Sequence, residues 1–304
     1  MHDTACEHGR LFFELYWDPA FSTVVELGSQ NVNGSLRDHC PAAASYIGMD
    51  MVPANGVDLV VTPGEPFPLA DESTDVAVTS SAFEHDVCFW ETFLDLVRLL
   101  RPGGLLYVNA PSNHAFHRYP VDCWRFYPDA GVALVAWAAR RGIAVELVES
   151  FVAAPRNEGW ADFVAVFRKA SSRPLTRRGR IADHSRAMNI HDGARKAGPE
   201  IENQRPETFD MLAAADLAAR LMQAERAARD AGGEAARQHA DNAALQEKIA
   251  ALTARIGARD AELADLSEAR RRLETDLKRI RASASWRITA PVRRVSALLK
   301  KGRR

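Results

Sequence analysis

The chain has 304 residues with a formal net charge of −1, and 47% of them are hydrophobic, which is enough to bury a core. Its four cysteines are scattered without a C-x-x-C pair, so a disulfide framework and a cysteine-based zinc site are excluded. The first ten residues lack signal-peptide features, and no apolar run approaches the ~18 residues that span a bilayer. We therefore expect a cytoplasmic location.

Strand-like and helix-like segments alternate over residues 1–170, which predicts an α/β domain with a mostly parallel sheet and helices on both faces. The expected strands are residues 22–28, 45–50, 57–61, 75–81, 105–111, 145–151 and 161–168. Helices should fill the gaps and include residues 9–17, 89–100 and 129–142. The last two strands lack a helix-length spacer, so we expect them to pair antiparallel in a seven-stranded sheet.

A different composition follows this domain. Residues 171–206 are polar and rich in Arg, Gly and Pro, which predicts a loosely ordered linker. Residues 207–282 have helical spacing, and their second half has strict heptads. The heptad positions are Leu245, Ile249, Leu252, Ile256, Arg259, Leu263, Leu266, Arg270, Leu273, Leu277 and Ile280. They predict a coiled coil and a homo-oligomer; the alternative is one long helix folded back on the first domain. Gly232 and Gly233 predict a break or hinge upstream.

The strongest chemical signal is the segment VVELGSQNVNGS at residues 24–35. A predicted strand carries the acidic Glu26 near its end, and Gly28 and Gly34 follow on the way to an expected helix. A glycine turn lets the backbone approach a ligand closely, and a helix N-terminus offers free N–H groups. Gln30 stands where a dinucleotide-binding G-x-G-x-x-G loop has its middle glycine, so the segment is not such a loop.

Asp50 ends the next predicted strand, 22 positions after Gly28. An acid at this place can accept both hydroxyl hydrogens of a ribose, as in nucleoside cofactor folds generally. Each hydrogen bond to a charged acceptor contributes roughly 1.5–3 kcal/mol. The alternative role for a single Asp at a strand end is a helix cap or a turn.

Four pieces stand in order along the domain: VVELGS with NGS, YIGMD, FPLADESTDVAVTSSAFEH and LLRPGGLLYVNAPS. Together they resemble the small-molecule methyltransferases of the seven-stranded, Rossmann-like type, most of all the subgroup that methylates ubiquinone and sterols. The resemblance implies S-adenosylmethionine as the cofactor. It also implies that Glu26 contacts the amino-acid end of the cofactor through the glycine loop, that Asp50 binds the ribose, and that Ser80 and Ser81 lie beside the methionine portion. The cofactor-binding residues predicted in this way are Glu26, Gly28, Ser29, Gln30, Gly34, Asp50, Met51, Gly64, Ser80 and Ser81.

Two departures from the family pattern affect this assignment. Gln30 and Asn33 stand in a loop that is usually richer in glycine. Pro63 and Gly64 occupy the place where the family often has Asp-Ala near the adenine.

Methyl transfer from a sulfonium needs alignment of donor and acceptor, and a hydroxyl or amine acceptor also needs a base. Substrate residues should follow the strand ends, at residues 82–86 and in the segment PSNHAFHRYPVDCWRFYP (residues 111–128), here called the substrate segment. Its aromatic and charged side chains suit a sugar, and a lid packed on the sheet edge is the alternative. We predict His117 or His85 as the base. The predicted substrate-binding residues are His114, Arg118, Tyr119, Asp122, Trp124 and Arg125. No set of residues has metal-ligand spacing, so no metal is predicted.

The last part, residues 283–304, is a basic amphipathic tail. Between Lys278 and Arg304 the chain has ten Lys or Arg and no acid. Its string S-x-S-W-R-x-T-x-P-x-R (residues 283–293) resembles one at the ends of bacterial glycosyltransferases and methyltransferases of surface-polysaccharide assembly, which implies a glycan acceptor. Its apolar residues among bases also predict a peripheral contact with the inner face of the membrane.

The sequence predicts methyl transfer to a sugar hydroxyl. Alternatives are a quinone-like or lipid acceptor, and an inactive methyltransferase-like scaffold assembled by its coiled coil. A nucleic-acid methyltransferase would carry N-P-P-Y or D-P-P-Y after the fourth strand, where this chain has SAFEH, so no nucleic-acid partner is expected.

Overall fold

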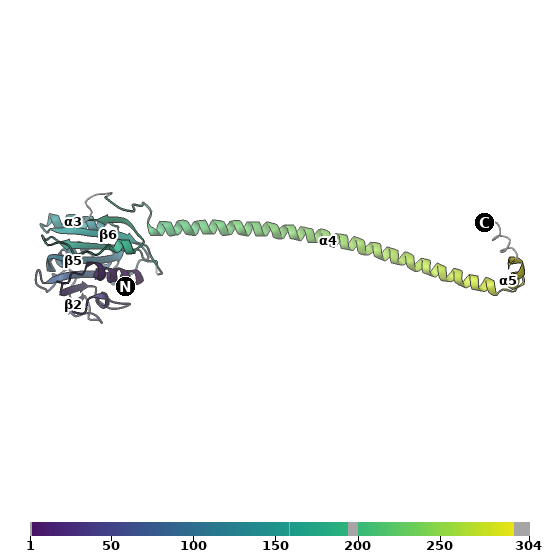
Figure 1. Cartoon of the computed structure of the whole chain (residues 1–304), viewed down its shortest axis with the longest axis horizontal. Coiled ribbons are helices and arrows are strands. Elements are labelled where there is room, and N and C mark those ends of the chain that lie inside the picture. Colours follow the sequence, from purple (N-terminus) through teal and green to yellow (C-terminus); the bar gives the residue numbers. More distant parts are fainter. Residues whose placement is uncertain (1, 158, 194–199, 295–304) are drawn as a thin grey trace. The chain divides into compact units, whose positions relative to one another are not determined.

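One mixed sheet forms the centre of the folded domain in the computed structural model, which describes residues 2–157, 159–193 and 200–294 (Figure 1). Its strand order is β3-β2-β1-β4-β5-β7-β6-β8. The strands are β1 (Thr23–Leu27), β2 (Ser45–Asp50), β3 (Leu59–Val60), β4 (Thr74–Ser80), β5 (Leu100–Pro111), β6 (Val145–Ala153), β7 (Asp162–Lys169) and β8 (Ala187–Asp192). The first five are parallel, and β7 pairs antiparallel with both β5 and β6. The predicted antiparallel pairing of the last two expected strands is therefore confirmed.

The prediction of seven strands is wrong, because β8 adds an eighth in the part of the chain that the structure describes. β8 pairs antiparallel with β6, with His191 beside Ser150 and Met188 beside Val152. It lies in the segment 171–206, for which the sequence predicts a loosely ordered linker. The short strand AMNIHD has too little apolar alternation to stand out, and its position depends on the edge that β6 offers.

Helices cover both faces of the sheet, as predicted. α1 (Asp3–Tyr16) packs on one face, where Phe12 meets Tyr107 of β5. α2 (Phe89–Leu99) and α3 (Asp129–Arg140) pack on the other face, where Phe93 meets Phe167 of β7. Successive strand residues alternate between the two cores because side chains of a strand point to opposite faces.

The expectation that helices fill every gap is wrong for the first half of the sheet. The glycine loop after β1 leads only to the four-residue 3-10 helix η1 (Leu36–His39). Pro41 follows directly, and proline cannot continue a helix. Between β2 and β4 the chain is described throughout and contains the two-residue β3 but no helix. The expected helix N-terminus at the glycine loop is therefore reduced to the first turn of η1.

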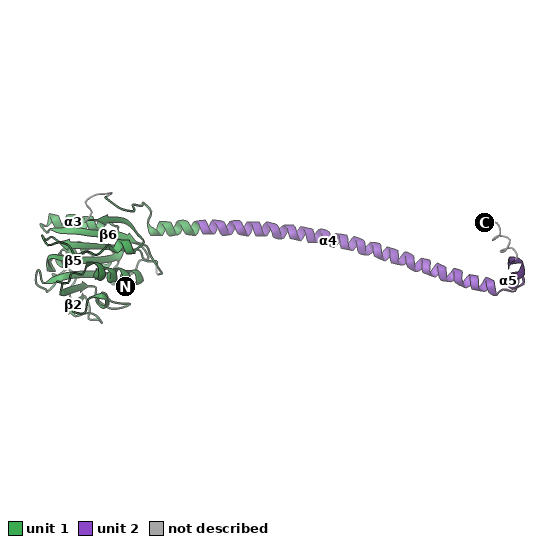
Figure 2. Cartoon of the chain, in the orientation of Figure 1, with its two compact units in different colours: residues 1–218 green, residues 219–304 purple. Residues whose placement is uncertain are grey.

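A single helix, α4 (Phe209–Ala282), makes up most of the rest of the chain. It has 74 residues and none is buried. The helix continues through Gly232 and Gly233, so the predicted break there is wrong. The chain divides into two compact units, residues 1–218 and residues 219–304 (Figure 2). No helix among the described residues is long and apolar enough to cross a membrane.

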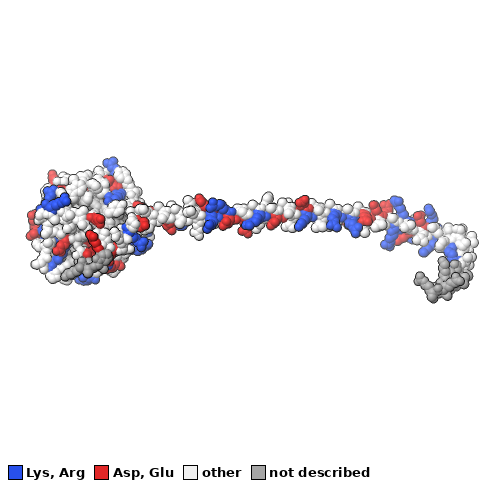
Figure 3. All heavy atoms as spheres, turned by 90° about the horizontal axis from the view of Figure 1, so that it is seen from above, with Lys and Arg blue, Asp and Glu red and all other residues white. Residues whose placement is uncertain are grey.

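The described part of the tail contains α5 (Ala284–Ile288), which Ser283 caps by accepting a hydrogen bond from the Trp286 N–H. Residues 295–304, with the last four bases predicted to act in the tail, lie outside the described residues. Along α4, acidic and basic side chains are interspersed over most of its length (Figure 3).

Candidate active site

The carboxyl ends of the parallel strands meet at one edge of the sheet. From β1 the chain goes on to β2 and β3 on one side, whereas β4 and β5 lie on the other side. β1 and β4 are direct neighbours, with Leu27 beside Thr79. Open parallel sheets bind ligands in the crevice at such a reversal of strand order. The predicted cofactor residues after β1, β2 and β4 therefore share this edge.

Gly28 turns the chain directly after β1, at the carboxyl edge of the sheet. Its φ of +82° lies in the left-handed region that favours glycine. A Cβ atom at this position would lie 2.9 Å from the Cβ of Ala82, just after β4. The N–H groups of Gly28 and Ser29 both donate to the carbonyl of Met49 in β2, at 2.9 and 3.1 Å. The glycine thus permits a close approach between the backbones that follow β1 and β4.

Glu26 lies in β1 with 2% of its surface exposed. The Tyr46 hydroxyl in β2 donates to its Oε2 atom at 2.8 Å. Burial raises the pKa of Glu26 to about 7, although the Tyr46 hydrogen bond and the nearby Arg37 charge act in the opposite direction. A cationic group on a ligand would favour the ionised carboxylate and lower this pKa again.

Asp50 ends β2 and uses both carboxylate oxygens on backbone N–H groups. One oxygen accepts from Gln30 at 3.1 Å and the other from Met51 at 2.7 Å. A carboxylate has about four lone-pair sites, so both oxygens can still accept hydroxyl hydrogens from a ribose. Met51 is exposed beside it. Asp50 therefore both shapes the glycine loop and lies at the edge where a cofactor would bind.

Two serines at the carboxyl ends of β1 and β4 have buried hydroxyls that find no hydrogen-bond partner among the described residues. They are Ser29, after β1, and Ser80, at the end of β4. Ser81 follows with a φ of +53°, a rare conformation for a residue with a side chain. Buried polar atoms without hydrogen-bond partners are uncommon, and a ligand or a water molecule normally supplies the missing hydrogen bond. These hydroxyls and the Asp50 carboxylate fit the polar groups of S-adenosylmethionine.

The remaining loop residues have more local roles. The Gly34 N–H donates to the Asn31 side chain at 3.1 Å, which closes the loop on itself. Gly64 lies beyond β3 with a φ of +82°, and a Cβ atom there would meet nothing within 4 Å. The Glu65 N–H donates to the Thr62 carbonyl at 3.1 Å, so the Gly64 conformation belongs to this turn.

The substrate segment is anchored on the turn that follows β4. The N–H groups of Cys123 and Trp124 donate to the Glu84 carbonyl at 2.7 and 3.3 Å. The Phe126 N–H donates to the Pro111 carbonyl at 3.0 Å, which brings the two ends of the segment together. These hydrogen bonds hold the segment beside η2 (Phe83–His85) at the carboxyl edge of the sheet.

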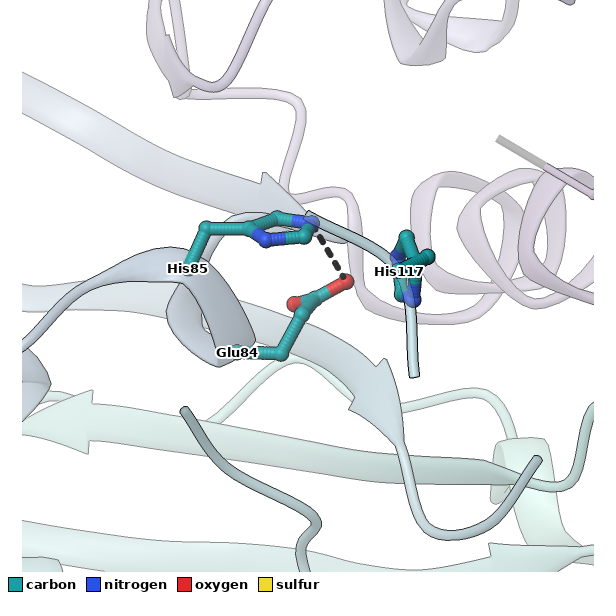
Figure 4. A group of neighbouring side chains, drawn as sticks. All are labelled: Glu84, His85 and His117. Atoms are coloured by element: carbon teal, nitrogen blue, oxygen red, sulfur yellow. Dashed lines mark ion pairs between the residues drawn. The ribbon is translucent and has the colours of Figure 1, made fainter. Parts of the chain in front are cut away.

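This anchoring brings Glu84, His85 and His117 together, and we call them the Glu84–His85–His117 group (Figure 4). One potential ligand atom from each residue lies within 4.8 Å of the other two. The His85 and His117 rings meet edge to face with centroids 4.9 Å apart. Glu84 Oε1 lies 3.7 Å from His85 Nε2. Both predicted bases thus share one site with a carboxyl group.

Burial sets the protonation of this group. Glu84 is 1% exposed, and burial raises its pKa to about 8. Burial also lowers the pKa of His85, so its ring is neutral at pH 7. The Val121 carbonyl lies within hydrogen-bond distance of His85 Nδ1 and therefore accepts the proton of that nitrogen. Nε2 is left with its lone pair, as a base or a metal ligand requires.

Within the substrate segment, Asp122 and Arg125 bind each other. The Arg125 guanidinium donates to both Asp122 oxygens, at 2.6 and 2.9 Å, and lowers the pKa of Asp122 to about 2. Arg125 also donates to the carbonyls of Asn113 and Ala115. These two predicted substrate residues therefore stabilise the path of the segment.

The other predicted substrate residues lie nearer to the surface. The Tyr119 hydroxyl donates to Gln30 Oε1 at 2.8 Å, which links the substrate segment to the glycine loop. His114 stacks on Trp160, with ring centroids 4.2 Å apart. Trp124 donates through its ring N–H to the Asp86 carbonyl at 2.8 Å. Arg118 is exposed.

The sequence prediction missed three site residues. Glu84 precedes a predicted base, but only the fold shows that its side chain is buried beside both histidines. Trp160 comes just before β7, and an antiparallel strand begins at the edge where its parallel neighbours end. Tyr46 lies beside Val24, two positions before Gly48 in β2, so its side chain is on the same face of the sheet as that of Glu26. Its contact requires the register in which Glu26 pairs with Gly48.

One family model matches part of the folded domain. Residues 26–108 match the family described as a methyltransferase domain. The match begins at Glu26 and covers Gly28, Asp50 and Ser80, so the predicted enzyme class and its cofactor S-adenosylmethionine are confirmed. The chain is an S-adenosylmethionine-dependent methyltransferase. A search of curated proteins gives no significant match.

Solved structures with similar folds include three that are matched over most of their own length. The [4+2]-cyclase SpnF is 12% identical, with 55% of this chain and 82% of that chain covered and a TM-score of 0.42. The 1,6-didemethyltoxoflavin-N1-methyltransferase of Burkholderia thailandensis, solved with S-adenosylhomocysteine, is 14% identical, with coverages of 55% and 77% and a TM-score of 0.41. YcgJ of Bacillus subtilis is 11% identical, with coverages of 56% and 100% and a TM-score of 0.39. At this level of similarity, the substrates of these proteins cannot be assigned to the present chain.

Proposed function

We propose that this methyltransferase acts on a hydroxyl of a sugar in a surface glycan. The observation that supports the proposal most is the Glu84–His85–His117 group at the carboxyl end of β4. It lies next to the cofactor crevice and beside the substrate segment, where an acceptor hydroxyl would meet the methyl group. The nearest enzymatic alternatives are a quinone-like or lipid acceptor.

The reaction needs one bond made and one broken. The acceptor oxygen forms a bond to the methyl carbon while the carbon–sulfur bond breaks and its electron pair returns to sulfur. S-adenosylhomocysteine leaves, and the hydroxyl proton must leave the oxygen. Alignment of the two reactants can supply ~7–11 kcal/mol of the barrier. A neutral imidazole within reach of the hydroxyl gives the proton a destination.

The surface of the substrate segment supports a sugar acceptor. Phe116, Tyr119 and Tyr127 are exposed by 74%, 57% and 59%. Exposed aromatic rings stack on the apolar faces of sugars, and hydroxyl groups beside them need polar partners. The exposed Arg118 and His114 supply such partners. A quinone or lipid acceptor would favour an apolar cavity without these charges.

Mass spectrometry of envelope glycans tests the acceptor. Cells that lack this protein should lose one methyl group from a surface glycan, and the intact protein should restore it. Identical glycans in both strains would reject the sugar acceptor while leaving the enzyme class intact. Calorimetry with S-adenosylmethionine separates the scaffold alternative, because a scaffold without a working site would give no binding heat.

We also propose that α4 self-associates through its heptad positions. Ile256 and Leu263 are 61% and 62% exposed in the single chain. Burying such a side chain in a partner contributes ~1.5–3 kcal/mol. Replacing both by Asp is expected to convert an oligomer to monomers in sedimentation velocity, because two charges per helix would have to be buried.

Ala254→Asp with Ala261→Asp is the matched control, since it adds the same charge at outward-facing heptad positions. This control should sediment like the unmodified chain. A monomeric unmodified chain would reject self-association.

We propose a peripheral membrane contact for the tail and the end of α4. Six of the ten bases lie among the described residues; they are Lys278, Arg279, Arg281, Arg287, Arg293 and Arg294. Trp286, Ile288 and Val292 are exposed among them. A base near an anionic leaflet contributes ~1 kcal/mol, and exposed apolar side chains can insert between the headgroups.

Vesicle flotation tests this contact. The full chain should float with anionic but not neutral vesicles, because the bases need a negative surface to bind. A chain ending at Ala282 should not float. Equal flotation of both chains would reject the contact.

A further inference from the structure

The Glu84–His85–His117 group has the composition of a metal site, although the sequence spacing predicts none. It combines two imidazoles with one carboxylate, a donor set that suits divalent transition-metal ions. The three residues come from η2 and from the substrate segment, which are brought together only by the fold. We propose that this group binds one divalent transition-metal ion beside the cofactor crevice.

The distances are close to those of a bound state. Ligands about 2.1 Å from a tetrahedral ion lie about 3.4 Å from one another. Glu84 Oε1 and His85 Nε2 are 3.7 Å apart, and one ligand atom from each of the three residues lies within 4.8 Å of the other two. Closing the remaining gap requires a rotation of His117, whose side chain is 39% exposed.

Both imidazoles are oriented in the way that metal ligands usually are. Ligating histidines direct their second nitrogen to a backbone carbonyl or a carboxylate. His85 Nδ1 faces the Val121 carbonyl. His117 Nδ1 lies 3.4 Å from both the Ala115 carbonyl and the Asp122 carboxylate. Nε2 of each ring is therefore left for an ion.

Glu84 supplies an independent observation. Its side chain is 1% exposed, and Oε2 is buried without a hydrogen-bond partner in the described part of the chain. Leaving a buried acceptor unsatisfied costs ~1–3 kcal/mol, and more for a charged group. A cation bound at this place would satisfy the carboxylate and favour its ionised form.

The proposed metal site adds detail to the proposed function. Only the catalytic role of the ion rests on that function; metal binding itself does not. A bound ion would hold the acceptor hydroxyl oxygen in an open coordination position and make its proton easier to lose to water. The oxygen would then form its bond to the methyl carbon as the carbon–sulfur bond breaks. With the ion bound, the two histidines act as its ligands, and water replaces the imidazole as the destination of the proton.

Metal binding can be measured without acceptor or cofactor. The untagged full chain is treated with chelator, dialysed, and titrated with Co²⁺ in a calorimeter, with visible absorption recorded in parallel. We expect one ion per chain and an absorption band from nitrogen and oxygen ligands. His85→Ala, His117→Ala and Glu84→Gln should each weaken binding ~10-fold or more. His184→Ala is the matched control, since His184 is exposed in η3 (Ile181–His184), outside the group.

Circular dichroism checks that each variant is folded. His117→Ala removes a partly exposed side chain, so it keeps the test decisive even if Glu84→Gln is unstable. S-adenosylmethionine binding, measured separately, should persist in the His117 variant, so a failure of the metal site is distinguishable from a failure of the methyltransferase. Absence of stoichiometric Co²⁺ binding, or equal affinity in His117→Ala and His184→Ala, would overturn the proposal.

Discussion

Replacing His117 by alanine is expected to lower the rate of methyl transfer ~100-fold or more, because a positioned base contributes ~10²–10⁴-fold to such a reaction. The same direction holds if His117 binds an ion, since the acceptor would then lose its activating group. His117 lies outside the glycine loop, so the affinity for S-adenosylmethionine should change by no more than about twofold. A large loss of rate with intact cofactor binding would thus assign His117 to the acceptor side.

The rate can be measured with radiolabelled S-adenosylmethionine and envelope glycans from cells that lack the protein. These glycans supply the unmethylated acceptor. His184→Ala serves as the control, because it removes an exposed imidazole from the same domain, outside the Glu84–His85–His117 group. A His117 variant that retains a rate within about threefold of the control would show that this side chain is not part of the chemistry.

The strands that carry the predicted cofactor-binding residues could be predicted from the sequence almost to the residue. The predicted ranges 22–28, 45–50 and 75–81 correspond to Thr23–Leu27, Ser45–Asp50 and Thr74–Ser80. These strands lie inside the sheet, so buried apolar runs and polar ends mark them clearly. Gly28 and Asp50 could be placed for the same reason, since each lies at the end of such a strand.

Features that depend on distant contacts could not be predicted. β8 acquires its partner only when β6 presents an edge. The meeting of Glu84 with His117 requires the substrate segment to hydrogen-bond to the Glu84 carbonyl, and nothing in local spacing specifies that contact. The sequence predicts substrate residues throughout the same segment, whereas Asp122 and Arg125 stabilise its own path.

The glycine pair of α4 illustrates the limit of local propensity. A glycine within a helix costs about 1 kcal/mol relative to alanine, which is why the sequence predicts a break at Gly232 and Gly233. Good helix formers on both sides, mainly Ala, Glu and Arg, extend the helix across this cost. Propensity summed over the whole segment therefore decides the outcome, and two unfavourable positions do not.

Replacing Asp50 by alanine is expected to weaken S-adenosylmethionine binding ~10-fold or more, because hydrogen bonds to a carboxylate contribute roughly 1.5–3 kcal/mol. Two effects act in the same direction. The variant loses the acceptor for the ribose hydroxyls, and it also loses the oxygens that hold the N–H groups of Gln30 and Met51. Calorimetry on the full chain measures the affinity directly.

Asp50→Asn separates these two effects. Its amide oxygen can still accept the Gln30 N–H and preserve the glycine loop, but it carries no charge and has one acceptor fewer. We expect its affinity to lie between those of the unmodified chain and Asp50→Ala. Asp38→Ala, which changes an exposed acid in the neighbouring η1, is the control and should bind normally. If folded Asp50→Ala binds the cofactor as tightly as this control, Asp50 does not hold the ribose, and its carboxylate serves only to shape the loop after β1.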